Sequence, residues 1–110
     1  MSDNLAAILG ELEQLIASRA KDGGDDSYTV KLLSGNEDTL LKKIIEEAGE
    51  TALAGKGGLP KKMTEELADL FFHCLVAMNC YNIALEDVAV ALASRQGVSG
   101  LSEKAERNSD

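Results

Sequence analysis

Five acidic side chains fall in two short clusters, and fifteen residues separate the clusters. The first cluster has the spacing E-E-x-x-E and the second has E-x-x-D. Helical residues three or four apart lie on one face, where like charges repel by about 0.2–0.5 kcal/mol per exposed pair. A divalent cation such as Mg²⁺ would relieve that repulsion, because it binds carboxylate oxygens and bridges to substrate phosphates. The five acids are Glu46, Glu47, Glu50, Glu66 and Asp69.

A solvated helix face is the plainer explanation of such acids. Glutamate is a good helix former, so the first cluster alone is better explained by solvation than by a cation. The second cluster reverses that preference, because its face continues through His73 into an apolar segment. His73 itself is predicted to be a satisfied buried histidine, or to support a site indirectly, rather than to bind a metal.

The apolar residues recur at the spacing of helices, which predicts an all-α chain. The one proline, Pro60, suits the first turn of a helix. Gly49 lies within the first acidic cluster, where glycine destabilises a helix by about 1 kcal/mol relative to alanine. Its presence indicates either neutral sequence drift or the close approach of another backbone or a ligand. Helices are predicted from residue 5 to a polar break at 21–26, and over 28–34, 37–54, 60–78 and 85–94.

The two acidic clusters lie on consecutive predicted helices, over 37–54 and 60–78. Glycines at 55, 57 and 58 end the first of these helices, so we expect a short turn and an antiparallel hairpin. The acidic patches should then meet across the hairpin. The apolar stripe of the first helix, from which the acids point away, comprises Leu40, Leu41, Ile44, Ile45, Ala48 and Ala52.

A length of 110 residues predicts a single domain. We place that domain at residues 1–95, as a bundle of four to five helices, and a C-terminal tail at 96–110. Between residues 70 and 78 only His73 is polar, so this segment needs apolar cover on every side. We therefore predict a homo-oligomer, most simply a twofold dimer with this helix at the interface.

The formal net charge of −8 indicates which partners to exclude. It argues against proteins that wrap nucleic acid and against docking on anionic membranes. The N-terminus has no basic region leading into an apolar one, and no stretch is long enough to span a bilayer. Cys74 and Cys80 form no CxxC motif and are predicted to be reduced core cysteines, so we expect a cytoplasmic protein.

The motifs around the acids resemble a known family. SYTVKL at 27–32, KKIIEEA at 42–48, ELADL at 66–70 and RQGVSGLSEKA at 95–105 are similar to phosphoribosyl-ATP pyrophosphohydrolase of histidine biosynthesis. The acid pattern alone resembles the wider all-α MazG-like superfamily of nucleoside triphosphate pyrophosphohydrolases. The resemblance covers about residues 5–107 and implies the stand-alone form of the enzyme.

The resemblance implies hydrolysis of phosphoribosyl-ATP to phosphoribosyl-AMP and pyrophosphate. Mg²⁺, for which Mn²⁺ would substitute, is expected on Glu47, Glu50, Glu66 and Asp69. Glu46 is the candidate for positioning or deprotonating the attacking water, although base and ligand roles could be exchanged among Glu46, Glu47 and Glu50. The predicted substrate contacts are Tyr28, Lys31 and Lys43, and either lysine could instead be a solubilising surface residue.

Two other functions remain open at this point. A house-cleaning pyrophosphatase acting on dUTP or dCTP would use the same five acids. A non-enzymatic helical module that dimerises through its apolar helix would show neither divalent-ion dependence nor pyrophosphate release. The paired acid motifs on adjoining helices argue against the second alternative.

Overall fold

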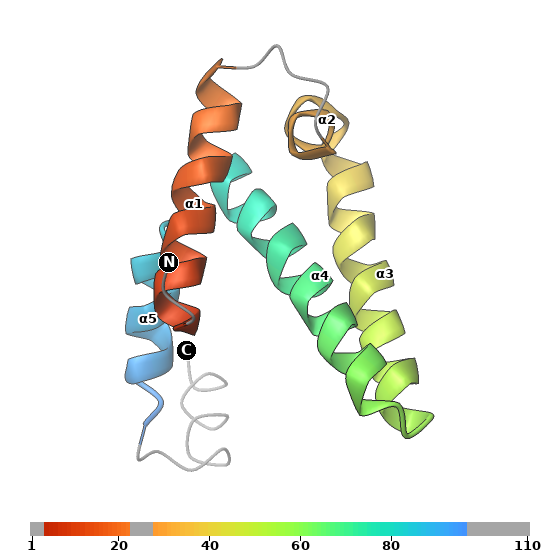
Figure 1. The fold of residues 1–110 in the computed structure, drawn as a ribbon. Helices are drawn as coiled ribbons and strands as arrows, with labels where there is room; N and C mark the ends of the chain where they lie inside the picture. The colour runs from red at the N-terminus through yellow and green to blue at the C-terminus, as the bar shows by residue number, and fades with distance from the viewer. Residues whose placement is uncertain (1–3, 23–27, 97–110) are drawn as a thin grey trace, which may run out of the picture.

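The computed structural model describes residues 4–22 and 28–96, which form five α-helices and contain no strand (Figure 1). The all-α prediction is therefore confirmed. Apart from Gln96, the predicted tail 96–110 lies outside the described residues, as does most of the similar segment at 95–105. The helices are α1 (Leu5–Asp22), α2 (Tyr28–Ser34), α3 (Glu37–Lys56), α4 (Pro60–Cys80) and α5 (Leu85–Ala93).

The predicted hairpin of α3 and α4 is the main packing unit of the fold. The two helices meet at their shared turn and diverge away from it, while α1 lies against the far end of α4 (Figure 1). The short helix α2 contacts both α1 and α4, and α5 lies beside α1. The two predicted acidic helices therefore form one side of the molecule, and α2 covers the wide end of the hairpin.

A Schellman motif closes the turn between α3 and α4. The amide N–H of Leu59 donates to the carbonyl of Ala54 at 3.1 Å, and that of Gly58 donates to Gly55 at 3.1 Å. Gly58 has a φ of +70°, a left-handed conformation that favours glycine. Pro60 then occupies the first turn of α4, as predicted. These contacts set the register in which the two acidic helices face each other.

The apolar core is small and lies where α1, α2, α3 and α4 meet. Part of the apolar segment at 70–78 is covered within the chain, because Leu75, Val76 and Ala77 are all buried. Phe71, in the same segment, remains 41% exposed, and α5 has no buried residue. The segment therefore needs a partner chain less than its sequence suggests. The core cluster consists of Ile16, Leu32, Leu40, Leu75, Val76 and Ala77.

The face of α3 that packs against α4 differs from the predicted one. Glu47, Thr51 and Ala54 are buried there, whereas Ile45, in the predicted apolar stripe, is 73% exposed. Small residues allow α3 to approach α4 closely: a Cβ added at Gly55 would lie 3.2 Å from the Met63 sulfur. Of the acids in the first cluster, Glu47 therefore turns inward, whereas Glu46 and Glu50 remain exposed. Of the predicted stripe, Leu40 is buried and Ile44 is half-buried, while the outward-facing members are Leu41, Ile45, Ala48 and Ala52.

The two cysteines are both free thiols, but only one lies partly in the interior. Cys74 is half-buried, and burial raises the pKa of its thiol. Cys80 is exposed at the end of α4, so the prediction of two core cysteines is wrong for this residue. It is the last residue of α4 and lines a shallow pocket with Arg19 and Ala20 of α1.

No single helix within residues 4–22 and 28–96 is long and apolar enough to cross a membrane. Only α4 and α5 taken together would reach that length and composition, and they meet at an angle of 111°.

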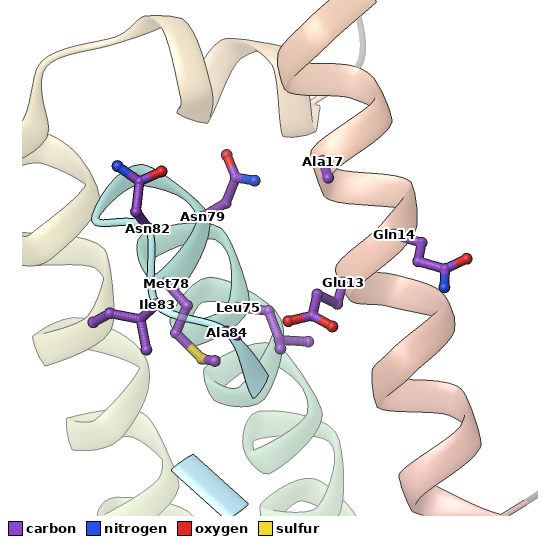
Figure 2. Close-up of a pocket in the computed structure, with 9 residues that line it drawn as sticks. All are labelled: Glu13, Gln14, Ala17, Leu75, Met78, Asn79, Asn82, Ile83 and Ala84. Carbon is purple, nitrogen blue, oxygen red and sulfur yellow. The ribbon is translucent and has the colours of Figure 1, made fainter. Parts of the chain in front are cut away.

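A pocket of about 390 Å³ lies between α1, the end of α4 and the segment 82–84 that leads into α5 (Figure 2). Leu75, Met78 and Ile83 supply apolar lining, and the carboxylate of Glu13 points towards the chain entering α5. There it accepts a hydrogen bond from the amide N–H of Leu85 at 2.6 Å, which caps α5. None of the predicted site residues lines this pocket, so it is distinct from the place where the acidic residues of α3 and α4 meet.

Gly49 offers a test of whether a ligand or partner approaches α3 closely at this position. A Cβ added at Gly49 or at Gly10 would have no atom within 4 Å. We expect Gly49→Ala and the control Gly10→Ala each to raise the free energy of unfolding by about 1 kcal/mol, as measured by urea denaturation. A stabilised Gly49→Ala that loses activity, beside an active Gly10→Ala, would show that a bound ligand or partner approaches residue 49. Destabilisation by Gly49→Ala would contradict the open space at this position.

Candidate metal centre

Three carboxylates from α3 and α4 converge in the seam between these helices. Glu47 of α3 and Glu66 and Asp69 of α4 each offer an oxygen, and these oxygens all lie within 4.8 Å of one another. Glu47 is buried, Asp69 is exposed, and the Glu66 side chain is 13% exposed. The prediction that the two acidic clusters meet across the hairpin is therefore confirmed for these three residues.

Two oxygens of this cluster are buried without a hydrogen-bond partner in the described part of the chain. They are Oε2 of Glu47 and Oε2 of Glu66. A buried carboxylate oxygen without a donor carries a desolvation penalty, and neighbouring negative charge adds to it. A cation bound between the helices would remove both costs, so the donor set fits a hard divalent ion.

Glu50 adjoins the cluster through Glu66. A hydrogen bond with the Glu50 side chain is the main cause that raises the pKa of Glu66, and burial and the negative charge of Glu50 add to it. The proximity of Glu50 thus favours the protonated form of Glu66. Without a cation, protonation therefore relieves part of the repulsion.

Glu46 points out of the cluster towards Lys43. The Lys43 Nζ lies 3.6 Å from Oε2 of Glu46, and both side chains are about two-fifths exposed. The neighbouring Tyr28 is the largest cause that raises the pKa of Lys43, ahead of Glu46, with Glu47 contributing less. Lys43 therefore pairs with Glu46 outside the three converging carboxylates.

Lys62 is a second cation beside the cluster, and the sequence analysis missed it. Its Nζ lies 3.8 Å from Oε1 of Glu66, one helical turn away. The spacing of Lys62 and Glu66, four residues apart on α4, was the signal available. A pocket of about 480 Å³ opens next to this pair, lined by Glu50, Leu53, Ala54, Leu59, Lys62 and Glu66.

His73 is buried and fully bonded, as predicted for a histidine that is not a metal ligand. It is 5% exposed; its Nδ1 lies 2.7 Å from the carbonyl oxygen of Asp69 and its Nε2 lies 2.7 Å from the Tyr28 hydroxyl. The bond between Tyr28 and His73 links α2 to α4 across 45 residues of sequence. Lys31, also on α2, is exposed and makes no described contact with the acids.

Comparison with known proteins decides the family. The family model described as phosphoribosyl-ATP pyrophosphohydrolase matches residues 9–96. The chain belongs to the phosphoribosyl-ATP pyrophosphohydrolase family. The resemblance of the sequence motifs to this family is thus confirmed, and the family's name describes a hydrolase.

Curated relatives match along nearly their whole length. A phosphoribosyl-ATP pyrophosphatase of Bordetella parapertussis is 49% identical, over 94% of this chain and 92% of the relative. One of Bordetella avium is 47% identical, over 99% of this chain and 93% of the relative. One of Neisseria meningitidis serogroup C is 43% identical, over 92% of this chain and 94% of the relative.

The raised pKa of Glu66 predicts how the stability of the metal-free protein depends on pH. The folded state holds this proton more tightly than the unfolded chain, whose pKa lies near the ordinary value of 4.5. The free energy of unfolding should therefore fall as the pH rises from 4.5 through the folded pKa of Glu66. Urea denaturation in EDTA should show a smaller fall for Glu66→Gln than for the unaltered protein.

Glu65→Gln is the matched control for this experiment. Glu65 precedes Glu66 on α4, is exposed, and lies outside the carboxylate cluster. The control should keep the pH dependence of the unaltered protein. If Glu66→Gln showed the same pH dependence as the unaltered protein, the raised pKa of Glu66 would be contradicted.

Proposed function

We propose that the chain hydrolyses phosphoribosyl-ATP to phosphoribosyl-AMP and pyrophosphate, in histidine biosynthesis, with Mg²⁺ as its cofactor. The observation that carries this proposal is the cluster of Glu47, Glu66 and Asp69 with its two buried, unpartnered oxygens. The family of the chain supplies the reaction and the substrate. A highly anionic substrate and an acidic site require cations between them.

The ligands we propose for the cation are Glu47, Glu66 and Asp69, joined by Glu50, which adjoins Glu66. Mg²⁺, or Mn²⁺ in its place, would neutralise these carboxylates and polarise phosphate oxygens when bound. The seam gives the ligands fixed positions, because Glu47 and Glu66 are held between two packed helices. Thr51 stiffens the same turn of α3 by donating its hydroxyl hydrogen to the Glu47 carbonyl at 2.8 Å.

Glu46 and the lysines take the remaining roles. We assign Glu46, outside the converging carboxylates, to orient or deprotonate the attacking water. Lys43 on α3 pairs with Glu46 and Lys62 on α4 pairs with Glu66, and we propose that both lysines, together with Tyr28, contact the phosphates. Lys31, which we also predicted as a substrate contact, lies apart from this group.

The activity is tested by measuring pyrophosphate release from phosphoribosyl-ATP. Release should stop in EDTA and return with Mg²⁺ or Mn²⁺, and Glu47→Gln should lower turnover by about 100-fold or more while far-ultraviolet circular dichroism stays unchanged. The matched control is Glu65→Gln, which should keep full activity. Chelator-insensitive turnover, or a fully active Glu47→Gln, would overturn the cation site. Faster cleavage of dUTP or dCTP would favour a house-cleaning pyrophosphatase.

We further propose that the chain works as a homodimer formed largely through the outer face of α3. The exposed residues Leu41, Ile45, Ala48 and Ala52 form one apolar stripe on that face. The radius of gyration is 16.1 Å, against about 13 Å for a compact domain of 100 residues, which supports an architecture completed by a second copy. We propose α3 for this interface, whereas the sequence analysis predicted α4.

The dimer is tested by placing a charge in the stripe. Ile45→Glu should give a species of 11.7 kDa by light scattering at micromolar concentration, while the unaltered protein has twice that mass. Burying one isoleucine contributes about 1.5–3 kcal/mol, and an unpaired charge at an interface opposes association. Thr39→Glu, on an exposed position of α3 outside the stripe, is the control and should remain dimeric. A monomeric unaltered protein, or a dimeric Ile45→Glu, would contradict this interface.

The remaining proposals concern organisation and location. We propose one domain over residues 1–95 and a tail over 96–110. The free and exposed Cys80 supports a reducing compartment, which for this chain would be the cytoplasm. The net charge of −8 gives no reason to propose nucleic acid or an anionic membrane as a partner.

A further inference from the structure

The pocket beside Lys62 continues from the carboxylate cluster towards the turn where α3 and α4 meet (Figure 1). Its volume of about 480 Å³ lies within the range of about 300–1,000 Å³ that small-molecule sites occupy. Glu50 and Glu66 line it next to the cluster, and Leu53 and Leu59 line it next to the turn. This turn-side pocket therefore joins a charged end to an apolar end.

Leu53 brings an apolar side chain to a face of α3 that carries charge elsewhere. It follows Glu46 and Glu50 at spacings of seven and three residues, so the three side chains share one face of the helix. Leu53 is 73% exposed, so it contributes little to the core of the fold. Where the charged face reaches the turn-side pocket, it therefore becomes apolar.

The turn supplies a second leucine to the same pocket. The amide N–H of Leu59 donates to the carbonyl of Ala54 at 3.1 Å, which fixes its backbone, and Leu59 is 51% exposed. Lys62 follows one turn later on α4, with its Nζ 3.8 Å from Oε1 of Glu66. In chain order along α4, an ammonium group therefore stands between an exposed leucine and the carboxylates.

These features fit a nucleotide whose phosphates lie at the carboxylate cluster. With a rise of about 1.5 Å per residue, Leu53 stands about 9 Å from Glu47 along α3, a distance that a ribose and a base together cover. The flat faces of a base pack on leucine side chains, while a phosphate pairs with the lysine. A protein segment over the pocket would instead have to supply partners for both Lys62 and Glu50, because burying an unpaired charge is costly.

We propose that the turn-side pocket binds the base and ribose of the substrate, with Leu53 and Leu59 against the base and Lys62 on the α-phosphate. This assignment rests on the proposed function, and it gives the substrate a direction along the hairpin. The nucleoside half points to the turn, and the pyrophosphate half points to the wide end of the hairpin, which α2 covers. The two leucines then select nucleotides over inorganic polyphosphates, which have no base to place on them.

Binding of the two reaction products tests this direction, because products bind without being turned over. In titration calorimetry with Mg²⁺ present, Leu53→Ala should weaken phosphoribosyl-AMP by about tenfold, the scale of one buried leucine contact, and leave pyrophosphate unchanged. Lys62→Gln should likewise weaken phosphoribosyl-AMP more than pyrophosphate. Equal losses for both products in either variant, or an unchanged affinity of Leu53→Ala for phosphoribosyl-AMP, would overturn the proposal.

Leu53→Met and Leu92→Ala are the matched controls. Leu53→Met keeps an apolar side chain of similar volume, so it should retain the affinity for phosphoribosyl-AMP. Leu92 on α5 is 61% exposed and does not line the turn-side pocket, so Leu92→Ala should change neither affinity. If either control lost as much affinity as Leu53→Ala, a specific contact between Leu53 and the base would be overturned.

Two further measurements exclude other roles for Leu53. By light scattering, Leu53→Ala should have the same mass as the unaltered protein, and it should bind Mg²⁺ alone with unchanged affinity. A lower mass would assign Leu53 to a contact between chains. Weaker binding of Mg²⁺ would assign its effect to the cation. Either result would overturn the proposal.

Failure of the proposed function gives a different result from failure of this proposal. If Leu53→Ala and the unaltered protein cleave phosphoribosyl-ATP with the same KM, the pocket assignment fails and the proposed function stands. If the unaltered protein releases no pyrophosphate, the proposed function fails, and magnesium ATP and magnesium triphosphate replace the products in the titration. The pocket assignment then holds if Leu53→Ala weakens ATP alone, and fails if it weakens both or neither.

Discussion

Repulsion between carboxylates in the seam of α3 and α4 is the constraint on which the other features depend. Glu47, Glu66 and Asp69 place three oxygens within 4.8 Å of one another, and two buried oxygens of this group have no partner in the described residues. A fold selected for stability alone would place apolar side chains here. Instead α3 turns Glu47 inward, and most of its apolar stripe faces outward. The proposed ion site and the proposed dimer surface are thus two consequences of one orientation of α3.

The surrounding elements hold this unfavourable arrangement in place. The Schellman turn at Gly58 and the close approach at Gly55 fix the register of the hairpin. Lys43 and Lys62 flank the cluster and offset part of its charge, but neither reaches the two unpartnered oxygens. The raised pKa of Glu66, caused mainly by Glu50, favours its protonation and relieves another part in the absence of a cation. The seam is therefore tolerable without an ion and better satisfied with one.

Much of this architecture follows from local patterns in the sequence. Capping at Asn36, the proline at the start of α4 and the glycine turn predict the hairpin, because these are short-range effects. The buried face of α3 was not predictable in this way. An apolar stripe indicates a surface that leaves water, but it does not say whether the same chain or a second copy covers it. Small residues at 51, 54 and 55 were the available sign of close helix packing.

Contacts between distant segments account for the rest. The bond between Tyr28 and His73 spans 45 residues, and no periodicity reports it. Glu46 and Glu47 are neighbours in sequence, yet a rotation of about 100° sends one to Lys43 and the other into the seam. Spacing alone therefore predicts that acids gather, and only the packing of α4 selects which of them converge.

Calorimetric titration of Mg²⁺ into the metal-free protein tests the central claim most directly. The unaltered protein and Glu46→Gln should both bind the ion saturably, because Glu46 lies outside the converging carboxylates. Glu47→Gln should weaken binding by at least about tenfold. Equal affinity in Glu47→Gln and the unaltered protein would contradict a cation site in the seam of α3 and α4.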